Sequence, residues 1–167
     1  MTNKLDWIPG LVQVADYGGD WDKYLNALYQ FFRKDFIDSN PMFRGTSVGI
    51  TKYPYSQGKE STFWHIISEG NVEEDRTPDF ERCKRIRWPR AIIEHCDGEA
   101  SIQVWENMHG REKRTLIRLI FAENDYLIVL AWHKTTVLLV TAYLITWESQ
   151  KNRLQKEYEV FKADTAL

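Results

Sequence analysis

The chain has 167 residues, of which 43% are apolar and 14% aromatic, so it can bury the core of one ordinary domain. Its formal net charge of −2 argues against a surface that attracts polyanions everywhere. It contains no apolar run of membrane-spanning length and no signal-peptide pattern. We therefore expect a single domain over residues 1–167 that is soluble, cytoplasmic and without a membrane partner.

The first forty residues predict a helical extension. Asp20 can cap a helix whose apolar residues recur at helical spacing until Asn40 and Pro41 stop it. Residues 41–58 contain three glycines and a further proline, which predicts mostly loop with a short strand at 47–52.

Short helices are predicted next. The stretch KESTFWHIISEG favours a helix over residues 61–70, with a strand as the alternative. Thr77 and Pro78 have the form of an N-cap followed by proline in the first turn of another helix. Pro89 disfavours helical geometry at the preceding tryptophan, so a break is expected before a last short helix at 91–96.

From residue 101 the apolar period changes from helical to alternating. Turn signals divide this region into four predicted strands, at 101–107, 113–121, 126–132 and 136–146. Their short connections indicate antiparallel pairing, and the tail returns to helical spacing. We therefore predict an α+β fold in which N-terminal helices pack on a four-stranded antiparallel meander over residues 101–146, closed by a C-terminal helix.

The last predicted strand carries two hydroxyl groups. Strict alternation places Leu139, Thr141 and Tyr143 on one face, with the two hydroxyl-bearing residues about 7 Å apart. Hydroxyls on an otherwise apolar central strand need hydrogen-bond partners. They either bond to neighbouring backbone or take part in a site.

A basic run lies in the middle of the chain. RCKRIRWPR contains five bases and a tryptophan, a mixture that single-stranded RNA binding uses. A solvated face paired with the preceding acidic stretch is the competing interpretation. Arg118, which lies between apolar neighbours on its strand face, either packs its stem and faces solvent or contacts an anion.

His65 lies between aromatic and isoleucine residues, a setting typical of a buried histidine bonded to backbone. Catalysis is the alternative. RNA cleavage without a metal needs a base for the 2′-hydroxyl, an acid for the leaving oxygen and cations or hydroxyls for the phosphate. Histidine, arginine, threonine and tyrosine can fill these roles together.

The set FWHI, RIRWPRAIIE and TAY resembles phage- and plasmid-borne proteins of the barnase, EndoU, colicin and RelE-like nuclease superfamily. The resemblance covers residues 43–162. It implies helices packed on a curved antiparallel sheet and endoribonuclease activity without a metal or other cofactor. It also raises an antitoxin or immunity protein as a partner beside the RNA substrate.

The residues that match this pattern are the expected site. As catalytic residues the resemblance implies His65, Arg87, Arg90, Thr141 and Tyr143. As RNA-binding residues we expect Lys59, Arg85, Trp88, Arg118 and Lys134. The turn before the last strand reads HKTT, where such proteins usually carry glycine or acidic residues, so the resemblance itself assigns no role to His133 or Lys134.

The sequence thus predicts an endoribonuclease of toxin or phage-effector type that cleaves tRNA or another structured RNA through 2′-hydroxyl attack. The alternative is a noncatalytic module that binds RNA through the basic run, or a protein through Trp7, Trp21 and Trp105. No oligomeric state follows from the sequence.

Metal-based alternatives are disfavoured. A metal-dependent nuclease would have to use acids such as Glu73, Glu74, Asp75 and Asp79, which do not converge on predicted strands. A zinc site at Cys83, His95 and Cys96 matches no common ligand spacing and lacks a fourth ligand. The two cysteines are expected to be free thiols.

Overall fold

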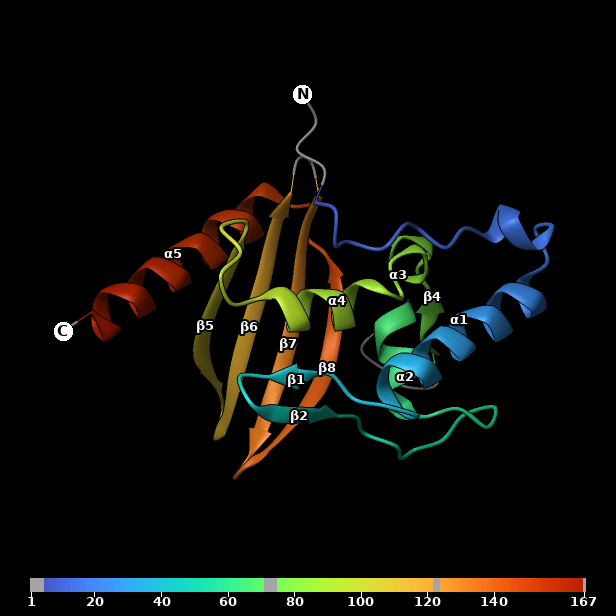
Figure 1. Ribbon diagram of the computed structural model, residues 1–167, viewed down its shortest axis with the longest axis horizontal. Coiled ribbons are helices and arrows are strands. Elements are labelled where there is room, and N and C mark those ends of the chain that lie inside the picture. Colours follow the sequence, from blue (N-terminus) through green and yellow to red (C-terminus); the bar gives the residue numbers. More distant parts are fainter. Residues whose placement is uncertain (1–4, 71–74, 122–123, 167) are drawn as a thin grey trace.

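The computed structural model describes residues 5–70, 75–121 and 124–166, which form an α+β fold (Figure 1). A curled six-stranded sheet has the order β1-β2-β8-β7-β6-β5. In that order the strands are Met42–Phe43, Thr46–Gly49, Thr136–Leu144, Asn124–His133, Glu112–Phe121 and Ile102–His109. The predicted α+β class is confirmed, and the four predicted strands correspond to β5 to β8.

The predicted four-stranded antiparallel sheet is wrong in its extent and in its pairing. Strand β2 adds to β8 in parallel, with Val48 opposite Val137 and Gly49 opposite Leu138, and β1 pairs antiparallel with β2. Strand β2 overlaps the strand predicted at 47–52 but begins and ends earlier, whereas β1 lies in the region predicted to be loop.

The helical elements are η1 (Val14–Tyr17), α1 (Trp21–Phe36), α2 (Ser61–Ile67), α3 (Phe80–Lys84), α4 (Trp88–His95) and α5 (Glu148–Thr165). Asp20 caps α1 as predicted, because its carboxylate accepts a hydrogen bond from the Lys23 amide. The helix ends four residues before Asn40, whose side-chain amide donates to the Phe36 and Val48 carbonyls instead.

Two helix starts differ from prediction. Residues 77 and 78 form strand β4 (Thr77–Pro78), which pairs with β3 (Ser68–Glu69), and α3 begins only after Asp79, whose carboxylate caps it. The predicted break between α3 and α4 is present, but it lies at residues 85–87 and not at Trp88, which begins α4. Pro89 is accommodated in the first turn of α4, where the missing N–H has no helical partner in any case.

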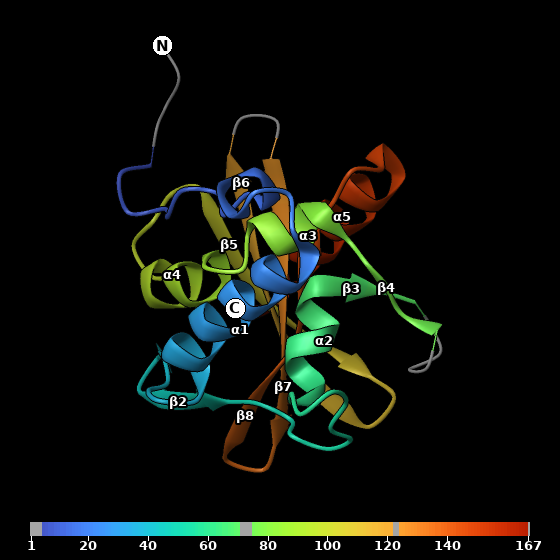
Figure 2. The same cartoon turned by 90° about the vertical axis from the view of Figure 1, so that its right-hand side faces the viewer.

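The two faces of the sheet carry separate apolar cores. Figure 2 shows α4 on one side of the sheet and α5 on the other. Residues from α1 to α4, such as Phe32, Phe63 and Ile92, pack with the first face. Trp105 and Leu116 on the second face pack against Leu154 of α5. Each side chain of the sheet therefore belongs to one of two distinct environments.

A β-bulge in β8 changes the predicted alternation. Thr141 pairs with Val129 of β7, but Leu139 pairs with Leu130, so Val140 is an extra residue. Leu139 therefore belongs to the α4 face, whereas Thr141 lies opposite a residue of the α5 face. The predicted grouping of Leu139 with Thr141 is wrong for this reason.

Candidate functional site

A cleft of about 240 Å³ opens on the α5 face of the sheet, beside α2. We call it the His65 cleft. Its polar lining residues are Thr51, Ser61, Thr62, His65, Glu112, Arg114 and His133, and its apolar floor includes Ala131 and Val140. The side chains of Glu112 and Arg114 are about one quarter exposed and that of His133 more than half, so a ligand can reach them.

The wall beside α2 is held by hydrogen bonds to the preceding segment. The Thr62 hydroxyl accepts a hydrogen bond from the Thr51 amide at 2.8 Å. The Ser61 and Thr62 amides donate to the Lys52 and Thr51 carbonyls. These bonds satisfy the first N–H groups of a helix that no side chain caps, and they fix His65 one turn further along.

The opposite wall is built by the β6–β7 pairing. Glu112 is the first residue of β6, and the pairing with β7 begins at the next residue, where Lys113 lies opposite Trp132. Its carboxylate contacts Arg114 Nε at 2.8 Å and His133 Nε2 at 3.5 Å. One carboxylate thus holds a guanidinium and an imidazole at the edge of the cleft that also contains the second imidazole, that of His65.

Thr141 contacts the backbone of His65. Its Oγ1 donates to the His65 carbonyl at 3.3 Å, and Arg82 Nη1 donates to the same oxygen at 3.0 Å. Arg76 Nη2 is 3.4 Å from that oxygen. The end of α2 is therefore anchored to β8 and α3 through these groups, and Thr141 acts on the helix that carries His65 rather than on its ring.

Tyr143 lies further along β8, at a neighbouring cavity of about 270 Å³. The guanidinium of Arg82 lies 5.0 Å from the centre of its ring, within cation–π range. Its hydroxyl accepts a hydrogen bond from Gln150 Nε2 at 3.3 Å. Tyr143 and Thr141 thus share the α5 face with the His65 cleft, although neither lines it.

The predicted arginines of α4 do not join this site. Arg90 binds Glu94 and the Asp35 carbonyl at 2.8 and 2.9 Å. Arg87 packs over the ring of Phe31. Both belong to the face of the sheet that α4 covers, away from His65. The structure therefore does not bring Arg87 and Arg90 together with His65, as the predicted catalytic set required.

Two further members of the basic run are structural. Arg85 is buried, pairs with Glu81 at 2.7 Å and lies 5.0 Å from the Trp88 ring. The indole of buried Trp88 donates to the Pro9 carbonyl. Hydrogen bonds from Arg85 and Lys84 lower the pKa of Glu81. Burial of Arg85 and Trp88 separates both from any RNA.

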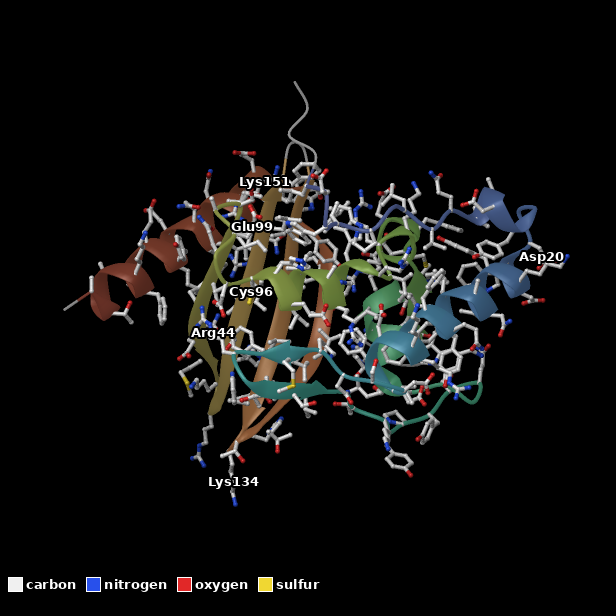
Figure 3. All side chains as sticks on the ribbon, viewed as in Figure 1. Asp20, Arg44, Cys96, Glu99, Lys134 and Lys151 are labelled. Atoms are coloured by element: carbon white, nitrogen blue, oxygen red, sulfur yellow. The ribbon has the colours of Figure 1, made fainter. Side chains whose placement is uncertain are left out.

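The remaining predicted RNA-binding residues lie apart from one another. Arg118 is 4% exposed and forms a two-armed ion pair with Asp125. Lys59 lies over the Tyr29 ring and donates to the Gln57 carbonyl. Lys134 stands at the tip of the β7–β8 turn and points away from the sheet (Figure 3).

Sequence reasoning missed Glu112 and Arg114 and left His133 without a role. The predicted strand began at residue 113, one residue too late to include Glu112. A Glu-x-Arg alternation at a strand start, with a histidine at the end of the next strand, was the available signal. It becomes informative only when the register of the hairpin is known.

The other predicted sites do not assemble. Trp105 is fully buried, and Trp7 is partly buried with one ring face stacked on His95. Glu73 and Glu74 lie outside the described residues. Within residues 5–70, 75–121 and 124–166, no three His, Cys, Asp or Glu side chains are grouped as a metal site.

The His65 cleft thus combines two imidazoles, a carboxylate and a guanidinium on one open surface. Such a set can move protons and neutralise a phosphate. No helix among the described residues has the length and apolar character needed to cross a membrane. No family model, no curated protein and no solved structure matches the chain.

Proposed function

We propose that the His65 cleft is the active site of a metal-independent endoribonuclease. The observation that carries this proposal is the convergence of His65, His133, Glu112 and Arg114 on one open cleft. Two imidazoles supply a base and an acid without any metal. Arg114 supplies the planar cation that suits a phosphodiester.

The reaction divides between the two walls of the cleft. One imidazole takes the proton of the 2′-hydroxyl, and the 2′-oxygen then attacks phosphorus. The bond from phosphorus to the 5′-oxygen breaks, and the other imidazole donates a proton to that oxygen. Glu112 orients His133 and Arg114, and Arg114 stabilises the charge on the phosphorane oxygens. The products are a 2′,3′-cyclic phosphate and a 5′-hydroxyl.

The proposed substrate is tRNA or another structured RNA, with an exposed strand that can enter the cleft. Thr141 is assigned a positioning role through the His65 carbonyl, and Tyr143 a place in substrate binding at the neighbouring cavity. A toxin or phage-effector role, with an antitoxin or immunity protein as its partner, belongs to this same proposal.

The test is cleavage of total RNA by purified protein in EDTA, with analysis of the fragment ends. The wild type is expected to produce 2′,3′-cyclic phosphate ends. His65→Ala and His133→Ala are each expected to lower the rate by about 10²-fold or more, the scale of general acid–base groups. His95→Gln is the control, because His95 is exposed on α4 and belongs to the other face.

Folding of each variant is checked by circular dichroism before the rates are compared. Cleavage that survives both histidine substitutions unchanged would remove this cleft from the mechanism. A protein that cuts no RNA class at all would leave the fold as a binding module.

A further inference from the structure

A second cavity, of about 480 Å³, lies along the face of α2 next to the one that borders the His65 cleft. We call it the aromatic pocket. Three rings line it, those of Trp21 from α1, Tyr55 from the segment before α2, and Trp64 from α2. Gln57 and Arg76 add an amide and a guanidinium. Its volume falls within the range of small-ligand sites.

The two tryptophan rings of the pocket are held in place by their neighbours. The Trp64 indole donates to the Ser56 carbonyl at 3.0 Å. Trp21 packs edge-on against Phe80, with ring centres 6.0 Å apart, although Phe80 itself is half exposed. A planar ligand would therefore meet surfaces that are already ordered, which lowers the entropy lost on binding.

The charge of the pocket selects among planar ligands. Arg76 is fixed beside it by hydrogen bonds to the Gly70 carbonyl at 2.9 Å and to Ser68 Oγ at 3.0 Å. Among the lining residues that the structure describes there is no acid. An organic cation is disfavoured by the guanidinium, whereas an uncharged ring on an anionic chain is favoured. The Gln57 amide offers a donor and an acceptor to the edge of such a ring.

The pocket and the His65 cleft share two structural elements. Trp64 and His65 are consecutive on α2, so their side chains leave the helix about 100° apart. The segment before α2 lines the cleft at Thr51 and the pocket from Pro54 to Gln57. A flexible chain can therefore run past α2 with one group in each of the two neighbouring cavities.

We infer that the aromatic pocket binds a nucleobase of a single-stranded RNA whose phosphodiester occupies the His65 cleft. The second half of this inference rests on the proposed function, whereas base binding in the pocket can be measured without cleavage. Stacking on aromatic side chains tolerates any base, so the pocket would select for an unpaired nucleotide rather than for a sequence.

The test is tryptophan fluorescence during titration with a short 2′-O-methylated oligoribonucleotide, which cannot be cleaved through its 2′-oxygen. Tyr55→Ala is expected to weaken binding about tenfold, the scale of one lost stacking contact. Tyr53→Ala is the matched control. Tyr53 is 74% exposed and touches the Tyr55 ring edge-on, but it does not line the pocket.

An abasic oligonucleotide with the same backbone separates base from phosphate binding, and it should bind Tyr55→Ala and wild type equally. His65→Ala should keep the base-dependent binding, so a failure of catalysis is distinguishable from a failure of the pocket. Equal affinity of the Tyr53 and Tyr55 variants for the intact oligonucleotide would overturn the inference. A change in tryptophan fluorescence that aromatic peptides cause and the oligoribonucleotide does not would likewise overturn it.

Discussion

Thr141 Oγ1 donates a hydrogen bond to the carbonyl oxygen of His65 at 3.3 Å, which links the bulged strand β8 to the end of helix α2. The same oxygen also accepts a hydrogen bond from Arg82, so it keeps a hydrogen-bond partner when Thr141 is changed. Thr141→Val is therefore expected to lower the free energy of unfolding by only about 1 kcal/mol, the net value of one hydrogen bond.

Urea denaturation of Thr141→Val and Thr141→Ser measures this contribution. The serine variant keeps the hydroxyl and should remain close to wild type. A serine variant as unstable as the valine variant would contradict this assignment, because serine keeps the hydroxyl that makes the hydrogen bond.

Glu112 is expected to matter for activity more than for stability. Glu112→Gln keeps the shape of the side chain but removes the charge that holds Arg114 and His133. We expect RNA cleavage to fall by about 10²-fold, while the free energy of unfolding changes by less than about 1 kcal/mol, as for partly exposed ion pairs. Kinetics and denaturation of the same preparation measure both quantities.

Glu106→Gln is the matched control for that experiment. Glu106 pairs with Lys113 at 3.5 Å on the opposite face of the same hairpin, so Glu106→Gln removes a more exposed ion pair outside the cleft. If the two variants cleave RNA equally well, Glu112 has no part in the reaction.

The ion pair between Arg118 and Asp125 is buried, with Nε–Oδ1 and Nη2–Oδ2 distances of 2.7 and 2.6 Å. Removal of one partner leaves an uncompensated buried charge. Asp125→Leu and Arg118→Met are each expected to cost about 3–5 kcal/mol of unfolding free energy. The double variant should recover much of that loss, because it buries no charge. Chemical denaturation of the wild type, the two single variants and the double variant gives the coupling free energy between Arg118 and Asp125. If the losses of the single variants simply add in the double variant, the two residues are not coupled and the prediction is wrong.

The two cysteines are expected to react slowly in the native protein. Burial raises the pKa of the Cys83 thiol to about 12 and that of Cys96 to about 11. Because the thiolate is the reactive form, a raised pKa leaves little of it at neutral pH. Titration with a disulfide reagent should show both thiols reacting fast in urea and slowly without it. A fast native phase would mean that one thiol is accessible.

The regular elements were predictable from sequence because their signals are local. The alternation over residues 101–146 gave all four long strands, and Asp20 gave the start of α1. The parallel pairing of Val48 with Val137 joins residues far apart in the chain, and no local pattern encodes it. The sheet order therefore needed the structure.

The candidate site was predictable only in part for the same reason. His65 and Thr141 do lie in contact, but Thr141 bonds to the backbone carbonyl of His65 and not to its imidazole ring. Arg90 has the residue type that a phosphate site needs, but it lies on α4, on the opposite face of the sheet from the His65 cleft, and bonds there to the Asp35 carbonyl. Residue type is visible in a sequence, whereas the face on which a side chain ends depends on tertiary packing.

The parallel addition of β2 also has a consequence for self-association. Strand β2 pairs with the first residues of β8, helix α2 also contacts β8, and the terminal strand β1 is two residues long. Such a short terminal strand offers few unpaired amides to a second chain. The longer terminal strand of the six-stranded sheet is β5, where the side chains of Trp105 and Asn107 are bonded to Glu157 of α5.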